Sequence, residues 1–147
     1  MLYVLCRIGR DAYAIPSALV VRILPFVALK TLPGAPVGVA GLLNFQGDSV
    51  PVVDLPLVVA GTPARAVLST RILLCSSAET SSRLVGVILE EVSRTAKLEE
   101  KDFQPAGAKG AACLQEVSPS SEGLIQRIDI PGIFPPGILA SLDLSVA

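Results

Sequence analysis

The chain has 147 residues, the length of one ordinary domain, which is enough to bury a hydrophobic core without disulfides or metals. Apolar residues make up 51% of it, and its 12 basic residues nearly balance its 13 acidic ones, so nothing attracts nucleic acid or acidic lipid. The chain contains no histidine, which excludes Ser-His-Asp and Cys-His catalysis and histidine metal ligation together. We therefore expect a protein without a catalytic site, cofactor or metal.

The apolar stretches are too broken to cross a membrane. The longest charge-free stretch, residues 31–47, is interrupted throughout by proline and glycine, whereas a spanning helix needs about 20 predominantly apolar residues. The N-terminal sequence MLYVLCRIGRD lacks the basic and long apolar regions of a signal peptide. The cysteines at positions 6, 75 and 113 have no paired spacing and are predicted to be small buried residues. We expect a cytoplasmic protein.

Short β-rich runs bounded by turn residues predict an all-β fold. In the first part of the chain, strands are expected at residues 2–8, 12–15, 20–23 and 26–29, with a helical turn at 16–19. Strands at 39–45 and 49–54 are predicted to form a hairpin across Gln46-Gly47-Asp48, because the glycine supplies the positive φ of a tight turn.

The second part of the chain continues this pattern. We expect a short helix at 55–61, a hairpin of strands 70–76 and 83–89, a strand at 92–98, a surface loop at 99–112, a hairpin of strands 113–117 and 124–130, and a last helix at 137–144. Roughly ten strands are more than one small barrel uses, so two packed barrels are expected.

Four sequence features, in matching order and spacing, carry a family resemblance. They are Gly9…Tyr13-Ala14-Ile15-Pro16, Leu32-Pro33…Pro36, Val39-Ala40-Gly41-Leu42-Leu43-Asn44-Phe45-Gln46-Gly47 and Val50-Pro51-Val52-Val53-Asp54-Leu55. With these and the later run RLVGVILEEV (residues 83–92), the chain resembles the CheW-type chemotaxis coupling domain over nearly its whole length. The resemblance implies two packed five-stranded SH3-like barrels with a few short helices, and a single domain over residues 1–147 with two barrel subdomains.

The resemblance also implies a function. Proteins of this family are non-catalytic scaffolds that join the cytoplasmic tips of chemoreceptors, the methyl-accepting proteins, to the regulatory domain of a CheA-type histidine kinase in bacterial chemosensory signalling. Such a protein is expected in the cytoplasm, recruited to membrane-associated receptor arrays, with no nucleic-acid binding and no direct membrane insertion.

The family's contacts can be carried over position by position. The expected receptor-binding residues are Ser17, Val20, Arg22, Ile72, Leu74 and Val85. They are expected to form an exposed strip between the barrels that receives the apolar face of a receptor helix, unless the apolar members are simply core. The expected kinase-binding residues are Val39, Gly41, Asn44, Gln46, Gly47 and Pro51.

Turn chemistry alone also explains much of this signature. Gly41 and Gly47 allow close backbone approach and a tight turn, Pro51 stiffens a strand, and Asn44 and Asp54 can accept hydrogen bonds from loop amides. Where this chain has Arg22 and Gln46, family members commonly carry an acidic residue and an arginine. The changed charges indicate either a different partner specificity or two tolerated surface substitutions.

Two other functions use the same carboxylates. The strand ending in Asp54 suggests a phosphoacceptor receiver, but such a domain needs further carboxylates for Mg²⁺ and alternating helices, and only Asp11 is available near the first strand. A hydrolase would pair Asp54 with Glu90 or Glu91, yet no sequence feature brings them together. The scaffold is the favoured interpretation.

Overall fold

The computed structural model describes residues 1–77, 83–105, 116–120 and 123–133. The described elements in chain order are β1 (Leu2–Ile8), β2 (Asp11–Pro16), a 3-10 turn (Ser17–Leu19), β3 (Val20–Pro25), β4 (Val39–Phe45), β5 (Asp48–Asp54), α1 (Leu55–Ala60), β6 (Arg71–Ser76), β7 (Leu84–Leu89), β8 (Glu91–Lys97), a second 3-10 turn (Glu100–Asp102), β9 (Gln104–Pro105), β10 (Glu116–Ser120), β11 (Gly123–Arg127) and α2 (Ile130–Ile133). The helix expected at 137–144 and the third cysteine lie outside the described residues.

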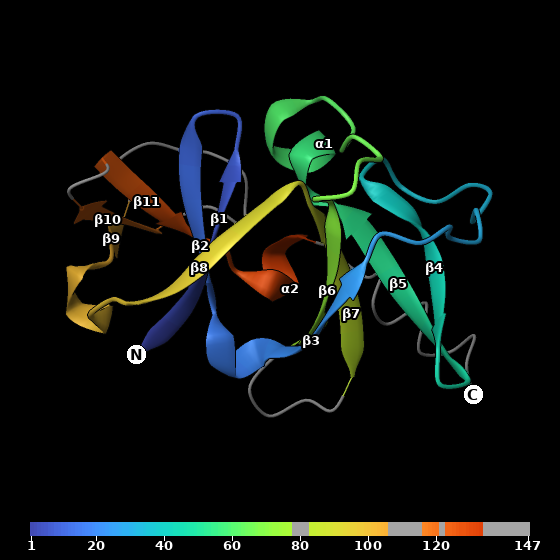
Figure 1. Cartoon of the computed structure of the whole chain (residues 1–147), viewed down its shortest axis with the longest axis horizontal. Coiled ribbons are helices and arrows are strands. Elements are labelled where there is room, and N and C mark those ends of the chain that lie inside the picture. The colour runs from blue at the N-terminus through green and yellow to red at the C-terminus, as the bar shows by residue number, and fades with distance from the viewer. Residues whose placement is uncertain (78–82, 106–115, 121–122, 134–147) are drawn as a thin grey trace.

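These strands form two sheets, which confirms the all-β prediction (Figure 1). One sheet has six strands in the order β8-β1-β2-β11-β10-β9, and we call it barrel A. The other has five in the order β3-β6-β7-β5-β4, and we call it barrel B. Barrel A has one strand more than expected because the two-residue β9 adds to its edge. Strands β3 to β7 fall between β2 and β8 in the sequence, so barrel B is nested within the chain of barrel A.

Barrel B closes through the segment that follows β3. The backbone of Lys30 exchanges two hydrogen bonds with Leu42 of β4, at 2.9 and 2.8 Å. Gly41 makes this approach possible, since an added Cβ there would lie 2.5 Å from the Lys30 carbonyl oxygen. The strand expected at 26–29 is wrong, because this segment crosses from one edge of the sheet toward the other and pairs only at Lys30.

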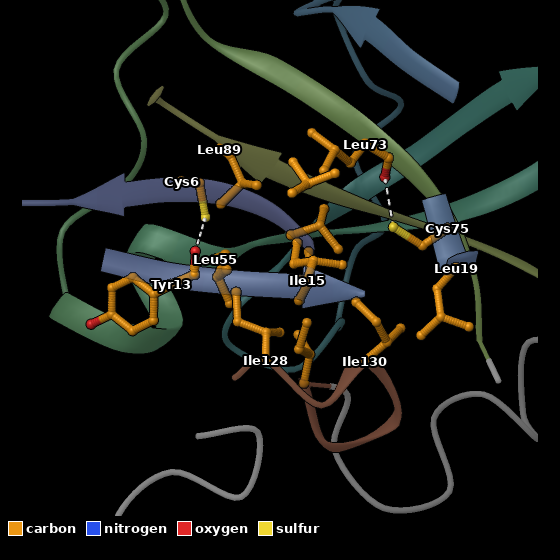
Figure 2. Packing of buried hydrophobic residues seen from close by; sticks show 14 of the residues in the cluster. Cys6, Tyr13, Ile15, Leu19, Leu55, Leu73, Cys75, Leu89, Ile128 and Ile130 are labelled. Carbon is orange, nitrogen blue, oxygen red and sulfur yellow. Dashed lines mark hydrogen bonds between the residues drawn. The ribbon is translucent and has the colours of Figure 1, made fainter. Parts of the chain in front are cut away.

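Alternating side chains on the strands feed three separate hydrophobic clusters. Six buried residues fill barrel A, among them Tyr3 and Leu5, and six fill barrel B, among them Ile72 and Leu74. Sixteen buried residues from both sheets and both helices form the inter-barrel core, shown in part in Figure 2. The largest cluster among the described residues therefore lies between the barrels, and strands such as β1 and β6 are covered on both faces.

The inter-barrel core contains Cys6 and Cys75, as the sequence predicted for buried cysteines. Their thiols lie 3.8 Å from the carbonyl oxygens of Tyr13 and Leu73 respectively (Figure 2). Burial raises the pKa of each thiol to about 12, because the thiolate would lose its hydration there. Both cysteines act as packing residues.

Helix α1, which the sequence predicted at 55–61, is capped at both ends. The carboxylate of Asp54 accepts the N–H of Leu57 at 3.1 Å, proline follows at the start of the helix, and Gly61 ends it in the left-handed conformation. Within the described residues, no helix has the length and hydropathy needed to cross a bilayer.

Candidate partner-binding surface

Three of the expected receptor-binding residues are inaccessible. Ile72 and Leu74 of β6 and Val85 of β7 are each 0% exposed. Ile72 and Leu74 belong to the cluster inside barrel B, whereas Val85 belongs to the inter-barrel core. The expected exposed strip is therefore wrong for these three, because both faces of their strands are covered and no face is left for a partner.

The other three lie together at the start of β3. Ser17 and Val20 are half-buried, and Val20 packs against the inter-barrel core. Arg22 is exposed. The described structure thus splits the expected receptor set into a buried group on β6 and β7 and an accessible group around β3.

Strand β3 exposes apolar residues that the sequence-based assignment missed. It is an edge of its sheet, and Val21 and Ile23 are 53% and 47% exposed. The register with β6 shifts between Val20 and Arg22, so Val21 is bulged out of the ladder. We call Val21, Arg22 and Ile23 the β3 surface. In the sequence, the adjacent Val20 and Val21 break the apolar–polar alternation of a regular strand, and this was the feature from which the bulge could have been predicted.

A pocket of about 370 Å³ adjoins the β3 surface. Its lining residues are Ile23 of β3, Ser69 and Arg71 at the start of β6, and Glu91 and Val92 of β8. Strand β8 is an edge of barrel A and β3 is an edge of barrel B, so the pocket lies where the two barrels meet. We call it the inter-barrel pocket. Its residues come from three distant segments, and no local sequence pattern links them.

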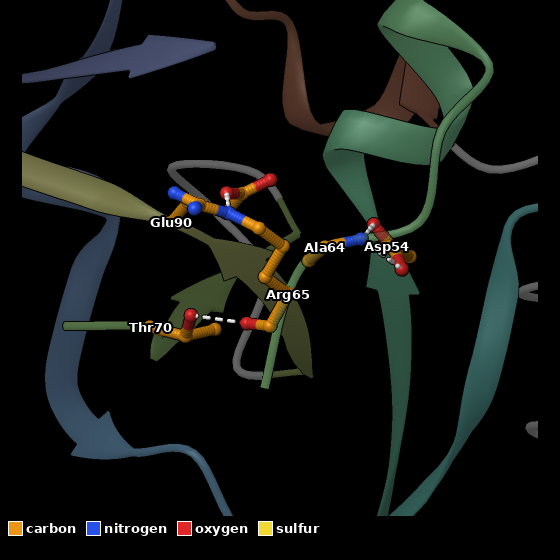
Figure 3. Close-up of polar contacts among 5 residues, drawn as sticks. All are labelled: Asp54, Ala64, Arg65, Thr70 and Glu90. Atoms are coloured by element: carbon orange, nitrogen blue, oxygen red, sulfur yellow. Dashed lines mark hydrogen bonds and ion pairs between the residues drawn. The ribbon is translucent and has the colours of Figure 1, made fainter. Parts of the chain in front are cut away.

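The segment leading into this pocket, residues 62–70, is held by polar contacts (Figure 3). The buried Asp54 carboxylate accepts the N–H of Ala64 with both oxygens, at 3.0 and 3.2 Å. Arg65 forms an ion pair with Glu90 at 2.8 Å, and this contact raises the pKa of Arg65. The Thr70 hydroxyl donates to the carbonyl of Arg65. These contacts fix the rim of the inter-barrel pocket.

The same contacts argue against both alternative functions, the hydrolase and the phosphoacceptor receiver. Asp54 is occupied by backbone N–H groups and Glu90 by Arg65, so the carboxylates are not paired with each other. The described residues contain no group of three or more cysteine or carboxylate side chains placed to hold a metal ion. The fold is two β-sheets rather than the alternating helices and strands of a receiver. Asp54 is a structural residue that caps α1 and ties down the following loop.

The expected kinase-binding residues all lie on the β4–β5 hairpin, as predicted from their spacing. Gly41 and Pro51 are buried and Val39 is half-buried, while Asn44, Gln46 and Gly47 are exposed at the tip. Gln46 and Gly47 have φ values of 52° and 88°, as expected for a type I′ turn, and the Asn44 side chain accepts the N–H of Gly47 at 3.1 Å. Of the expected kinase-binding residues, the exposed ones therefore lie at the tip of the hairpin.

One contact joins the two predicted sites. The guanidinium carbon of Arg22 lies 5.4 Å from the centre of the Phe45 ring, a cation–π arrangement. Phe45 immediately precedes the hairpin tip and packs against the cluster inside barrel B. Arg22 of the β3 surface and the β4–β5 tip are therefore neighbours, where the two edge strands of barrel B, β3 and β4, approach each other.

Comparisons with known proteins agree with this architecture. The CheW-like domain model matches residues 2–135. The chain is 26% identical over 99 residues to the chemotaxis protein CheW of Rhizobium meliloti, a match that covers 67% of this chain and 62% of that protein. It also superimposes on the crystal structure of the scaffolding protein TtCheW from Thermoanaerobacter tengcongensis with a TM-score of 0.80 and 18% identity, covering 91% of this chain and 87% of that one. On the match to residues 2–135, the chain belongs to the CheW-like domain family.

Proposed function

We propose that this protein is a non-catalytic scaffold that couples chemoreceptors to a CheA-type histidine kinase in bacterial chemosensory signalling. Membership of the CheW-like family supports this, together with similarity to a chemotaxis protein and the fold of a scaffolding protein. In this role residues 1–147 act as one unit in the cytoplasm and are recruited to membrane-associated receptor arrays. The observation that carries the proposal is the exposed apolar edge strand β3 beside the inter-barrel pocket.

The receptor is proposed to bind at the β3 surface and the inter-barrel pocket, rather than along β6 and β7. A helix from the receptor tip would place its apolar side chains against Val21 and Ile23. Fully burying an isoleucine contributes about 1.5–3 kcal/mol, and Ile23 is 47% exposed, so about 1 kcal/mol remains available there. Several such contacts are needed for a stable complex.

The kinase regulatory domain is proposed to bind at the tip of the β4–β5 hairpin. Asn44 and Gln46 are the exposed side chains of the expected kinase set there, while Gly41, Gly47 and Pro51 shape the hairpin that presents them. Gly41, Gly47 and Pro51 therefore act through the geometry of the hairpin and not by direct contact with the kinase.

A paired substitution tests the receptor-binding part. Ile23→Glu places a charge in the proposed site, and Val37→Glu places the same charge at a residue that is 89% exposed and outside both β3 and the pocket. Binding is measured by calorimetry to the purified cytoplasmic fragment of a chemoreceptor from the same genome. We expect about tenfold or more weaker binding for Ile23→Glu, and no change for Val37→Glu, because a charge would be desolvated only in the first case.

Two controls make the result interpretable. The thermal midpoints of both variants should match the parent, because both positions are exposed at a sheet edge or in a loop. The kinase regulatory domain should still bind Ile23→Glu. Equal receptor binding by both variants would show that the β3 surface is not the receptor site, and failure of the parent chain to bind either partner would refute the scaffold proposal.

A further inference from the structure

The segment before β6 forms one wall of the inter-barrel pocket, and apolar packing does little to hold it there. Ser69 lines the pocket beside Arg71, the first residue of β6. Residues 65–69 are all exposed, and the two large apolar side chains among them, Val67 and Leu68, are 42% and 97% exposed. Polar contacts therefore decide where this wall of the pocket stands.

Backbone hydrogen bonds fold the segment into a compact turn. The N–H of Val67 donates to the carbonyl of Arg65, and the N–H of Thr70 donates to the carbonyl of Val67, both at 3.0 Å. The Thr70 hydroxyl donates back to the Arg65 carbonyl. We call residues 65–70 the 65–70 turn. It is a small unit, so its place relative to the pocket depends on the few contacts that link it to the rest of the molecule.

An ion pair links this turn to another wall of the pocket (Figure 3). The Nε of Arg65 donates to the carboxylate of Glu90 at 2.8 Å, and Glu90 lies at the bend between β7 and β8. The next two residues, Glu91 and Val92, line the pocket. The hydrogen bond to Glu90 raises the pKa of Arg65, and the charges of Glu90 and Glu91 add to this. Because β7 belongs to barrel B and β8 to barrel A, the pair ties the turn to the point where the chain crosses between the barrels.

We propose that Arg65 and Glu90 are positioning residues for partner binding: their ion pair holds the 65–70 turn against the β7–β8 bend and thereby sets the shape of the inter-barrel pocket. This rests on the proposed function, in which a chemoreceptor helix binds at this pocket. The described residues that line the pocket do not include Arg65 or Glu90. The pair therefore acts through Ser69 on one wall and Glu91 on another.

An exposed ion pair adds little to global stability, yet it can decide the order of a small turn. The side chain of Arg65 is 68% exposed and that of Glu90 is 21% exposed, so water and salt screen their attraction. The three hydrophobic clusters do not include this pair, and the fold survives its loss. A released turn occupies its binding-competent position only part of the time, and the apparent affinity falls by that fraction.

The test breaks the pair and then rebuilds it with its charges exchanged. The full chain and its Arg65→Ala, Arg65→Lys, Glu90→Arg and Arg65→Glu/Glu90→Arg variants are titrated with the purified cytoplasmic fragment of a chemoreceptor from the same genome. We expect about three- to tenfold weaker binding for Arg65→Ala and Glu90→Arg, and a smaller loss for Arg65→Lys, which keeps the charge. The double variant should return to within about twofold of the parent, because it restores the ion pair.

Two controls accompany the titrations. Arg10→Ala removes an exposed arginine in the turn between β1 and β2, away from the pocket, and should bind the fragment with parent affinity. The thermal midpoints of all the variants should lie within about 2 °C of the parent, because the substitutions are on the surface.

Hydrogen exchange measures the positioning without a receptor. The N–H groups of Val67 and Thr70 are bonded within the turn, so they should exchange severalfold faster in Arg65→Ala and at the parent rate in the double variant. Unchanged exchange in Arg65→Ala would show that other contacts hold the turn and would overturn the proposal.

The binding results separate positioning from direct contact. If the double variant binds weakly although its exchange rates match the parent, the charges of Arg65 and Glu90 meet the receptor themselves and the positioning role is refuted. Parent affinity in Arg65→Ala despite faster exchange would refute it as well, because the place of the turn would not matter to the partner. If the parent chain does not bind the fragment at all, the proposed function fails, and the exchange rates then report only a structural role for the pair.

Discussion

Truncation of Leu74 separates a core role from a binding role for the residues on β6. Leu74 is 0% exposed and packs inside barrel B, so Leu74→Ala should leave a cavity and lower the free energy of unfolding by about 3 kcal/mol. For a chain of 147 residues, a loss of about 1 kcal/mol lowers the melting temperature by about 2–4 °C, which gives about 6–12 °C here. Ile23→Ala, at a residue that is 47% exposed, should lower it by no more than about 2 °C.

Both variants are compared by urea unfolding followed by circular dichroism, and by receptor-fragment binding at a temperature where both are folded. We expect Leu74→Ala to be destabilised with parent affinity, and Ile23→Ala to be stable with reduced affinity. The reverse pattern, an undisturbed melting temperature and lost binding for Leu74→Ala, would show that Leu74 faces a partner and that the burial of β6 has been misassigned.

Three further predictions concern stability. An added Cβ at Gly86 would lie 2.8 Å from the Val52 side chain inside barrel B, so Gly86→Val should cost about 1–3 kcal/mol and lower the urea midpoint; an unchanged midpoint would contradict the tight packing. Asp54→Ala removes the acceptor for two backbone N–H groups and should cost about 1–2 kcal/mol by the same measurement, whereas no loss would mean that water replaces the carboxylate. Burial raises the pKa of Cys6 and Cys75 to about 12 in the folded protein, whereas the pKa of a thiol in the unfolded chain is about 8.5. The unfolded chain therefore loses these protons first, and the free energy of unfolding should fall as the pH rises from about 9 to 11. A Cys6→Ala variant should show a shallower fall, and an identical slope would exclude this origin.

The strands were predictable wherever local chemistry decides. The hairpin at 39–54 has regular apolar runs and a glycine turn, so β4 was predicted with its observed bounds and β5 to within one residue. β1 was also predicted with its observed bounds. The segment at 26–29 has strand-forming residues, but a strand also needs a neighbouring strand to pair with. In this part of the chain only the next residue, Lys30, has such a partner.

The candidate surface was less predictable, because exposure is a tertiary property. A short apolar run such as β6 fits a strand with one open face as well as a strand covered on both faces. Carrying over family positions therefore selected the buried Ile72, Leu74 and Val85, whereas Val21 is exposed at a bulge and Ile23 on an edge strand. The inter-barrel pocket depends on the packing of two sheets, which no single segment encodes.

The nesting of barrel B within the chain of barrel A sets an order for assembly. All the strands of barrel B are consecutive in the sequence, so they can pair as soon as residues 20–89 have left the ribosome. Barrel A can be completed only later, because β2 pairs with β11, which lies more than a hundred residues further along the chain. Strand β1 can already pair with β8, but until β11 is available β2 has an unpaired edge, and the slow step of folding is expected to be the late closure of barrel A.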